Sequence, residues 1–331
     1  MGRDFVLNCK GALPNITRHD DRNHNDGQSS PALLYRQIKL HHNIMKKILV
    51  PIDFSQNSRN ALNVAAEIAS KHGAALELLH VNLAAIYAAP FSEYVVASGY
   101  TAEDEQYDQT AAGGLENIKM ELMSNPNYSK LNITIRVEEG YLHTSVRNVA
   151  NEDGVDLVVM GTKGAAGMEE FLVGSNTEKV IRTAPCPVLA VPGNIQKFDP
   201  KMVLLPSTLK SDQAGVFHYL AQWDKVFDFH LKVLYLNNPS GLPTDGSAEA
   251  QKNRFVEAAG LKKSDVIITS GTFFEDNAIL VAADICKADM IVMATHQRQG
   301  LSHFLFGSIT EDTVNHSHIP VLAVPIGWRE N

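Results

Sequence analysis

Two pairs of residues frame the part of this chain whose types and spacing suit phosphate binding. Gly161 and Gly164 follow an apolar run, and nine residues later come Gly174 and Ser175. A glycine backbone approaches phosphate oxygens closely and tolerates positive φ, and the N–H groups of a first helical turn attract anions. The spacing therefore predicts a loop that wraps a triphosphate and ends at a helix start, where the Ser175 hydroxyl donates a further hydrogen bond.

Glycine spacing alone is a weak signal, because glycine loops often serve only as turns. The loop contains no Gly-Lys-Ser/Thr and no GxGxxG, so it is neither a P-loop nor a dinucleotide-binding fingerprint. Lys163 offers a positive charge to a phosphate, although on a flexible stem. A phosphate loop and a simple turn are both compatible with this pattern.

Asp53 is the second residue with chemical potential, and it directly follows an apolar run at 47–52. The carboxyl ends of parallel strands lie at one sheet edge, so Asp53 is expected beside the glycine loop. A carboxylate there can accept hydrogen bonds from ribose hydroxyls. The alternative is that Asp53 caps or turns into the next helix. Val81 ends the second apolar run, where main-chain groups can read an adenine edge.

The elements that must position these residues alternate along the chain from Met45 onward. Short β-branched runs predict buried parallel strands, and apolar residues at helical spacing predict helices between them, with Ser55 as a cap and Gly73 as a stop. The alternation predicts an α/β fold with a doubly wound parallel sheet. We expect strands at 47–52, 75–81, 133–138, 155–160 and 187–191, and helices after Ser55, at 105–124, at 143–152 and from near Gly174.

An ungapped internal repeat shows that the chain holds two copies of one domain. Residues 159–192 realign on 292–325 at a constant offset of 133, and 202–206 mirrors 48–51. We expect one domain at 45–194 and a second at 195–331, with 194–200 as linker. Pairing of the two fifth strands would form a pseudo-dimer and cover exposed strand edges.

The second copy departs from the first where phosphate and ribose would bind. Gly161 becomes Ala294, Gly164 becomes Gln297, and Asp53 aligns with Thr208. Added Cβ atoms cost about 1–2 kcal/mol each if φ must be positive. We therefore expect a structural role for the second copy and nucleotide only in the first.

Composition narrows the class of protein. A length of 331 residues suits two domains, and a net charge of -8 makes nucleic acid and anionic membranes poor partners, although a local basic patch is compatible with it. No apolar run reaches the roughly 18–20 residues that span a bilayer, and no secretory signal is evident, so we expect a cytoplasmic protein. Residues 1–44 lack periodicity and are interpreted as a disordered leader or a mis-called start, with a metal-binding or targeting arm as the alternative.

Cysteines and histidines give little support for a metal site. The three cysteines follow no metal spacing, and we expect buried thiols. Scattered surface histidines are expected in the second copy, with a metal or pH-sensing site as the alternative. The residues in question are Cys9, Cys186, Cys286, His296, His303, His316 and His318.

These motifs together resemble the universal stress protein family. The resemblance rests on Val-Pro-Ile-Asp-Phe-Ser at 50–55, Leu-Leu-His-Val at 78–81, the glycine loop, and Pro-Val-Leu-Ala-Val-Pro at 187–192, and it covers 45 to about 326. It implies Rossmann-like five-stranded sheets of order 3-2-1-4-5, ATP in a subset of members, and dimerisation through strand five. By position it implicates Ile52, Asp53, Val81, Met160, Gly161, Gly164, Gly174, Ser175 and Asn176.

The resemblance implies a regulatory or protective stress protein that binds ATP, with or without Mg²⁺, in the first copy. Two other functions stay open: an ATP-independent interaction protein with vestigial loops, and a slow ATPase. The sequence holds no Ser/His/Asp order, no HxGH and no SGGxDS loop, so we expect weak hydrolysis at most. The protein partner and the oligomeric state are undetermined by the sequence.

Overall fold

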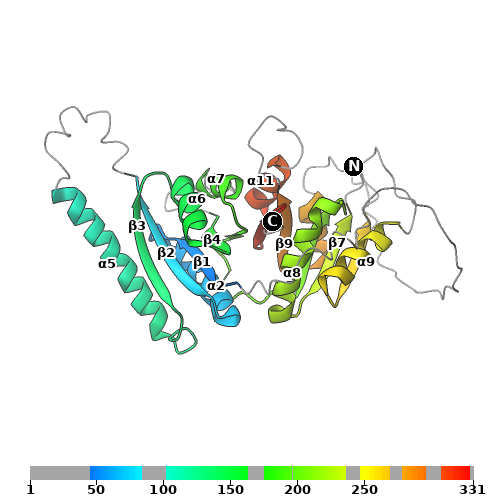
Figure 1. Ribbon diagram of the computed structural model, residues 1–331, viewed down its shortest axis with the longest axis horizontal. Helices are drawn as coiled ribbons and strands as arrows, with labels where there is room; N and C mark the ends of the chain where they lie inside the picture. Colours follow the sequence, from blue (N-terminus) through cyan, green and yellow to red (C-terminus); the bar gives the residue numbers. More distant parts are fainter. Residues whose placement is uncertain are drawn as a thin grey trace, which may run out of the picture.

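A computed structural model describes residues 45–83, 102–162, 175–195, 197–235, 247–268, 278–295 and 307–328. The described elements fall into two similar sets, which we call the first unit (β1 to β5) and the second unit (β6 to β10) (Figure 1). The first unit contains β1 (Lys47–Pro51), α2 (Gln56–His72), β2 (Ala75–Asn82), α5 (Ala102–Ser124), β3 (Ile133–Glu139), α6 (Leu142–Asp153), β4 (Leu157–Gly161), α7 (Ser175–Thr183) and β5 (Val188–Val191).

The second unit repeats this order with a shorter second helix, which has 13 residues where α5 has 23. It contains β6 (Met202–Ser207), the 3₁₀ turn η2 (Ser211–Gln213), α8 (Ala214–Phe227), β7 (His230–Tyr235), α9 (Ser247–Ala259), β8 (Ser264–Ile268), α10 (Ala278–Cys286), β9 (Met290–Thr295), α11 (Gly307–His316) and β10 (Val321–Pro325). The predicted alternation of strands and helices in the first copy is confirmed, with boundaries that shift by up to three residues.

Ten strands form one sheet in the order β3-β2-β1-β4-β5-β10-β9-β6-β7-β8. Pairing is parallel within each unit and antiparallel where β5 meets β10, with Leu322 opposite Leu189. Each unit therefore has the order 3-2-1-4-5 that the resemblance implied, and the predicted pairing of the two fifth strands is present.

Both faces of this sheet are covered by helices, and both cores run through both units. Helices α2, α5, α8 and α9 bury apolar side chains on one face, and α6, α7, α10 and α11 do so on the other (Figure 1). Each core contains residues of both units, for example Ile48 with Phe217 and Leu49 with Leu204. The contact between the units is therefore an apolar core rather than a polar docking surface.

Local sequence explains how the first helix begins and ends. The Ser55 hydroxyl accepts a hydrogen bond from the Ser58 N–H, and Gly73 ends α2 in the left-handed conformation at φ 71°, as predicted. In the second unit Lys210 stands at the position of Ser55 and makes no capping bond. The chain there begins with η2 before α8 starts, because the side-chain acceptor is missing.

In each unit an aspartate accepts hydrogen bonds from the N–H groups at the amino end of the first strand. Asp156 accepts hydrogen bonds from the N–H groups of Lys46 and Lys47 at 2.5 and 2.9 Å. Asp289, at the offset of 133, accepts from the N–H groups of Lys201 and Met202 at 2.8 Å each. Asp156 is buried and Asp289 is exposed, so the same device is more costly to lose in the first unit.

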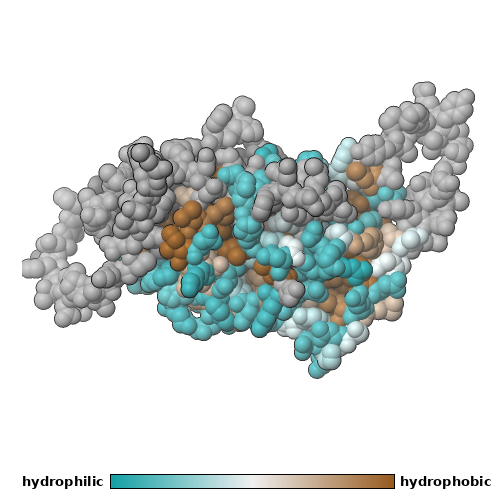
Figure 2. All heavy atoms as spheres, turned by 180° about the vertical axis from the view of Figure 1, so that it is seen from behind, coloured by the Kyte–Doolittle hydropathy of each residue, from teal (hydrophilic) through white to brown (hydrophobic). Residues whose placement is uncertain are grey.

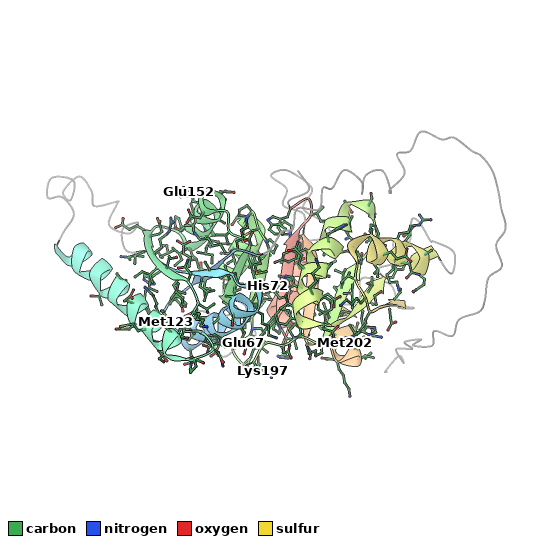
Figure 3. All side chains as sticks on the ribbon, turned by 60° about the horizontal axis from the view of Figure 1, so that its bottom comes forward. Glu67, His72, Met123, Glu152, Lys197 and Met202 are labelled. Atoms are coloured by element: carbon green, nitrogen blue, oxygen red, sulfur yellow. The ribbon has the colours of Figure 1, made fainter. Side chains whose placement is uncertain are left out.

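A seam of aromatic residues joins α2 of the first unit to α8 of the second. The Phe198 N–H donates to Glu67 Oε2 at 2.6 Å, and the Phe198 ring packs edge-on against Phe227 at 5.5 Å between centroids. His72 lies 6.1 Å from both Trp223 and Phe227 by ring centroids, and Figure 3 labels it between the two units. Burial, assisted by the neighbouring Lys71 charge, lowers the pKa of His72 to about 4.

Candidate functional site

The carboxyl ends of β1, β2 and β4 form the edge where the first unit brings its predicted residues together. The order 3-2-1-4-5 reverses between β1 and β4, and ligands of open α/β sheets bind outside the strand ends at such a point. Ile52 and Asp53 follow β1 there, and Met160 and Gly161 end β4. Val81 lies one strand away, half-buried near the end of β2.

Asp53 takes part in the turn that starts α2. Its Oδ1 accepts hydrogen bonds from the N–H and the hydroxyl of Ser55, at 3.0 and 2.6 Å. The same Ser55 hydroxyl caps α2, so the carboxylate orients the capping group. The turn role weighed as the alternative from sequence is therefore present, and Asp53 is at the same time exposed at the strand-end edge.

The loop that carries Asp53 is held in a constrained conformation. Phe54 has φ of 62°, which costs about 1–2 kcal/mol for a residue other than glycine. The centroid of its ring lies 4.8 Å from that of His80. The ring also packs against Gly114, where an added Cβ would stand 2.8 Å from a carbon of the Phe54 ring. Leu209, the counterpart in the second unit, has φ of 54°. Since both units share this strain, it belongs to the geometry of the loop rather than to a ligand.

His80 anchors the loop from the neighbouring strand. Its Nδ1 lies 2.8 Å from the Ile52 carbonyl oxygen, and the Ile52 N–H donates to Leu79 O at 2.8 Å. Both contacts run from β2 to the residue just before Asp53. The position of Asp53 beside Val81 is thus fixed by packing and hydrogen bonds of the strand ends.

Gly161 is required by close packing. A Cβ there would stand 3.0 Å from the Asn57 carbonyl oxygen and 3.1 Å from its carbon, in the first turn of α2. Gly161 is not among the glycines with positive φ. The preference for glycine at this position therefore comes from the 3.0 Å approach of another main chain and not from a positive φ.

The first turn of α7 is tied to the end of β4. The Thr177 hydroxyl donates to the Gly161 carbonyl oxygen at 3.0 Å, and Thr177 is buried. Asn176, the second residue of the helix, is exposed. The first turn of α7 therefore lies at the same edge as Asp53 and Gly161, and the N–H groups of a helix start favour an anion.

Part of the predicted phosphate loop lies outside the described residues. Lys163, Gly164 and Gly174 lie outside the described residues, and Ser175 is described only as the first residue of α7. Sequence reasoning missed the positioning roles of Asn57 and Thr177. The repeat carried a signal for the second of these, since Thr310 occupies the position of Thr177 and is also buried.

The corresponding edge of the second unit is closed by different contacts. The buried Ser207 hydroxyl donates to Gln213 Oε1 at 2.6 Å and accepts from the Leu209 N–H at 2.9 Å. Thr208, at the position of Asp53, is half-buried, and Ala294, at the position of Gly161, is 5% exposed. The turn of the second unit is therefore held by the Ser207 hydroxyl, at the position of Ile52, and no carboxylate stands at the position of Asp53.

The described residues give no support to a metal centre. No group of three or more His, Cys, Asp or Glu side chains there could hold a metal ion. His316 lies beside Asp312 on α11 and is exposed, as is His318, while His296 and His303 lie outside the described ranges. Cys186 is buried, as predicted, whereas Cys286 is only half-buried and Cys9 is not described.

Within the described residues, no helix is both long and apolar enough to cross a bilayer.

Comparison with known proteins gives concordant matches over both units. The model of the universal stress protein family matches residues 45–192 and 223–325. Universal stress protein YxiE of Bacillus subtilis is 30% identical over 152 residues, which are 45% of this chain and 99% of that protein. A crystal structure of a universal stress protein from Archaeoglobus fulgidus superposes with a TM-score of 0.64 at 19% identity, covering 86% of this chain and 99% of the other.

Proposed function

Because this chain belongs to the universal stress protein family, we propose that it is a tandem stress-response protein that binds ATP in its first unit only. Its role is regulatory or protective, and hydrolysis is slow at most. The observation that carries the proposal is the convergence of Asp53, Gly161 and the α7 start at the point where strand order reverses. A cytoplasmic location and the domain boundaries 45–194 and 195–331 are parts of the same proposal.

The residues present fit an adenine nucleotide. The close packing of Gly161 on Asn57 sets the end of β4 against the first turn of α2, and the tied α7 start offers N–H groups and a partial positive charge to phosphates. Asp53 would accept hydrogen bonds from the ribose, and Ile52, Val81 and Met160 are the residues proposed to hold the base. Gly164, Gly174, Ser175 and Asn176 would surround the phosphates, with or without Mg²⁺.

The direct test is mass spectrometry of ligand released from protein purified without added nucleotide, followed by equilibrium binding. We expect ATP to be released, and the double variant Gly161→Val, Gly174→Val to lose binding. Binding as tight as wild type in this variant would show that the loop is wrongly assigned.

Turnover separates the remaining functions. Tight binding with a negligible rate supports a regulatory protein, whereas steady-state hydrolysis above roughly 1 s⁻¹, the lower end of ordinary enzymes, would indicate a true ATPase. Absence of both retained nucleotide and binding would favour an ATP-independent interaction protein.

A further inference from the structure

Helix α5 contains two adjacent glycines, Gly113 and Gly114, in its interior. Glycine weakens a helix interior relative to alanine, because its backbone loses more conformational freedom on folding. The 13 residues of the counterpart helix α9 include no glycine, so the fold itself does not require glycine in this helix. A reason other than helix formation must therefore account for the pair in α5.

The surroundings of the two glycines differ. A Cβ on Gly114 would stand 2.8 Å from Cε1 and 3.1 Å from Cζ of the Phe54 ring, whereas a Cβ on Gly113 would meet no atom within 4 Å. Gly113 is exposed, and Leu115, the residue after the pair, is fully buried in the core beneath α5. The burial of Leu115 fixes the helix at this point, so the missing side chain of Gly114 leaves room for the Phe54 ring.

Contacts from two other elements hold the Phe54 ring at the strand-end edge of the first unit. The ring of His80 on β2 lies 4.8 Å away by centroids, and Gly114 on α5 receives two of the ring carbons. The ring is nevertheless 36% exposed. Hydrophobic side chains gather over α10 on the opposite face of the sheet (Figure 2), so the Phe54 ring does not belong to that surface.

The second unit holds the equivalent turn in a different way. Leu209, at the position of Phe54, shares the left-handed conformation but is buried, and its N–H donates to the Ser207 hydroxyl at 2.9 Å. Ile52, at the position of Ser207, has no hydroxyl that could accept this bond. Because a left-handed residue other than glycine persists only where its surroundings fix it, the first unit depends on the ring contacts of Phe54 instead.

The turn that Phe54 occupies also sets the direction of the Asp53 carboxylate. Phe54 lies between Asp53 and Ser55, and the N–H and hydroxyl of Ser55 donate to Asp53 Oδ1 at 3.0 and 2.6 Å. A displacement of the Phe54 main chain therefore changes both hydrogen bonds and turns the carboxylate. Since α5 determines where the Phe54 ring can lie, the position of this helix is linked to the position of Asp53.

We propose that Gly114 is a positioning residue for the nucleotide site, through which α5 sets the affinity for the ribose of ATP. The inference rests on the proposed function, because it takes Asp53 as the acceptor of the ribose hydroxyls. Gly114 itself contacts no ligand, and it acts by leaving the space in which the Phe54 ring keeps the Asp53 turn in place. Linkage is reciprocal, so a nucleotide that fixes Asp53 also stabilises α5 around Gly114.

The test is isothermal titration of the full chain with ATP and with dideoxy-ATP, which lacks both ribose hydroxyls. Gly114→Ala should weaken the binding of ATP about fivefold and leave the binding of dideoxy-ATP unchanged, because only ATP uses the Asp53 contact. A merely structural effect would weaken both ligands alike. In the Phe54→Leu background Gly114→Ala should have no further effect, since the ring carbons that meet the new methyl group are absent.

The neighbouring glycine supplies a matched control. Gly113→Ala adds the same methyl group one residue earlier, where it meets no atom within 4 Å. It should leave the affinity for ATP unchanged and raise the midpoint of thermal unfolding by about 2 °C, because alanine favours the helix.

Amide hydrogen exchange of wild type keeps the proposal testable if Gly114→Ala fails to fold. ATP should slow the exchange of the α5 amides around Gly114. Wild type that binds no ATP would overturn the proposed function and this inference together. If wild type binds ATP, the inference alone is overturned by unchanged exchange in α5, by a Gly114→Ala variant that binds ATP as wild type does, or by equal losses for ATP and dideoxy-ATP.

Discussion

The strand-end edges of the two units share a backbone but differ in what they present. Both have a left-handed residue after the first strand, Phe54 in one and Leu209 in the other. The first unit exposes the Asp53 carboxylate, whereas the second closes the same turn with the buried Ser207–Gln213 hydrogen bond. Both units keep the left-handed residue, which the fold requires. Only the first unit keeps the carboxylate, which a ligand would require.

The amino ends of the strands also differ between the units, because they carry different ion pairs. In the first unit the buried Glu77 binds Arg136 Nε at 2.7 Å and Lys47 Nζ at 2.9 Å. Burial opposes the charge of Lys47, but its hydrogen bonds to Glu77 and Asp153 raise the pKa of Lys47, and the Lys47 ammonium holds the pKa of Asp153 below its usual range. In the second unit Lys232 stands at the position of Glu77 and pairs with the more exposed Asp265.

The largest expected effect comes from removing Glu77. Glu77→Ala should lower the free energy of unfolding by about 3 kcal/mol, because Lys47 and Arg136 lose a buried hydrogen-bonded partner. Lys232→Ala in the second unit should cost at most about 1 kcal/mol, since its partner is half exposed. Urea denaturation measures both, and equal losses would contradict the contrast between the two amino ends.

Gly161 offers the next test. Gly161→Val should destabilise the protein by about 2 kcal/mol, because the new side chain collides with the Asn57 main chain. The control is Ala294→Gly, which removes one methyl group from the second unit and should cost about 1 kcal/mol. If urea denaturation finds Gly161→Val as stable as wild type, the packing account of this glycine fails.

Asp156 and Asp289 occupy equivalent positions, so one substitution in each unit compares their contributions to stability. Asp156→Ala leaves two strand N–H groups at a buried site without an acceptor and should cost about 2 kcal/mol. Asp289→Ala exposes the equivalent groups to water and should cost about 1 kcal/mol or less. Chemical denaturation of the two single variants checks the order, and the reverse order would be incompatible with the observed burial.

The seam between the units should be sensitive to acid. The folded-state pKa of His72, about 4, lies below the usual 6.5, so folding favours the neutral ring. Stability is complete above about pH 6.5 and declines as pH falls toward 4, because the unfolded chain binds the proton more readily. His72→Phe should flatten this part of the stability profile, as measured by thermal unfolding between pH 7 and 4. An unchanged slope in the variant would exclude His72 as the source.

The smallest effect should be seen at Asp53. Asp53→Ala is expected to weaken ATP binding about tenfold, roughly 1.4 kcal/mol, with little loss of stability because the turn is exposed. Thr208→Val in the second unit should leave the affinity unchanged. Isothermal titration of the two variants measures both, and equal effects would remove the proposed asymmetry.

The sequence predicted the elements well because their signals are local. The Ser55 cap, the Gly73 stop and the β-branched strands all act within a few neighbouring residues, and the structure confirms them. The resemblance to the family, together with the repeat, also predicted the joining of the fifth strands. The sequence could not show that packing requires a glycine at position 161. Asn57 lies far away in the sequence and contacts Gly161 only after α2 packs on β4.

Two further features depend on tertiary packing and escaped the sequence. The left-handed Phe54 is held by His80 and Gly114 from two other elements, so no local pattern marks it. The burial of His72 arises from contact between the two units through Phe198. Helical spacing places His72 in line with the apolar residues of its helix, but the aromatic partners that bury it lie in the second unit.

The asymmetry between the two strand-end edges is tested most directly by the stoichiometry of ATP binding to the full chain. Isothermal titration calorimetry should give one ATP per chain, lost in the double variant Gly161→Val, Gly174→Val and retained when Thr208 is changed to Val. Two equivalent sites per chain, or one site that survives the double variant, would contradict the account.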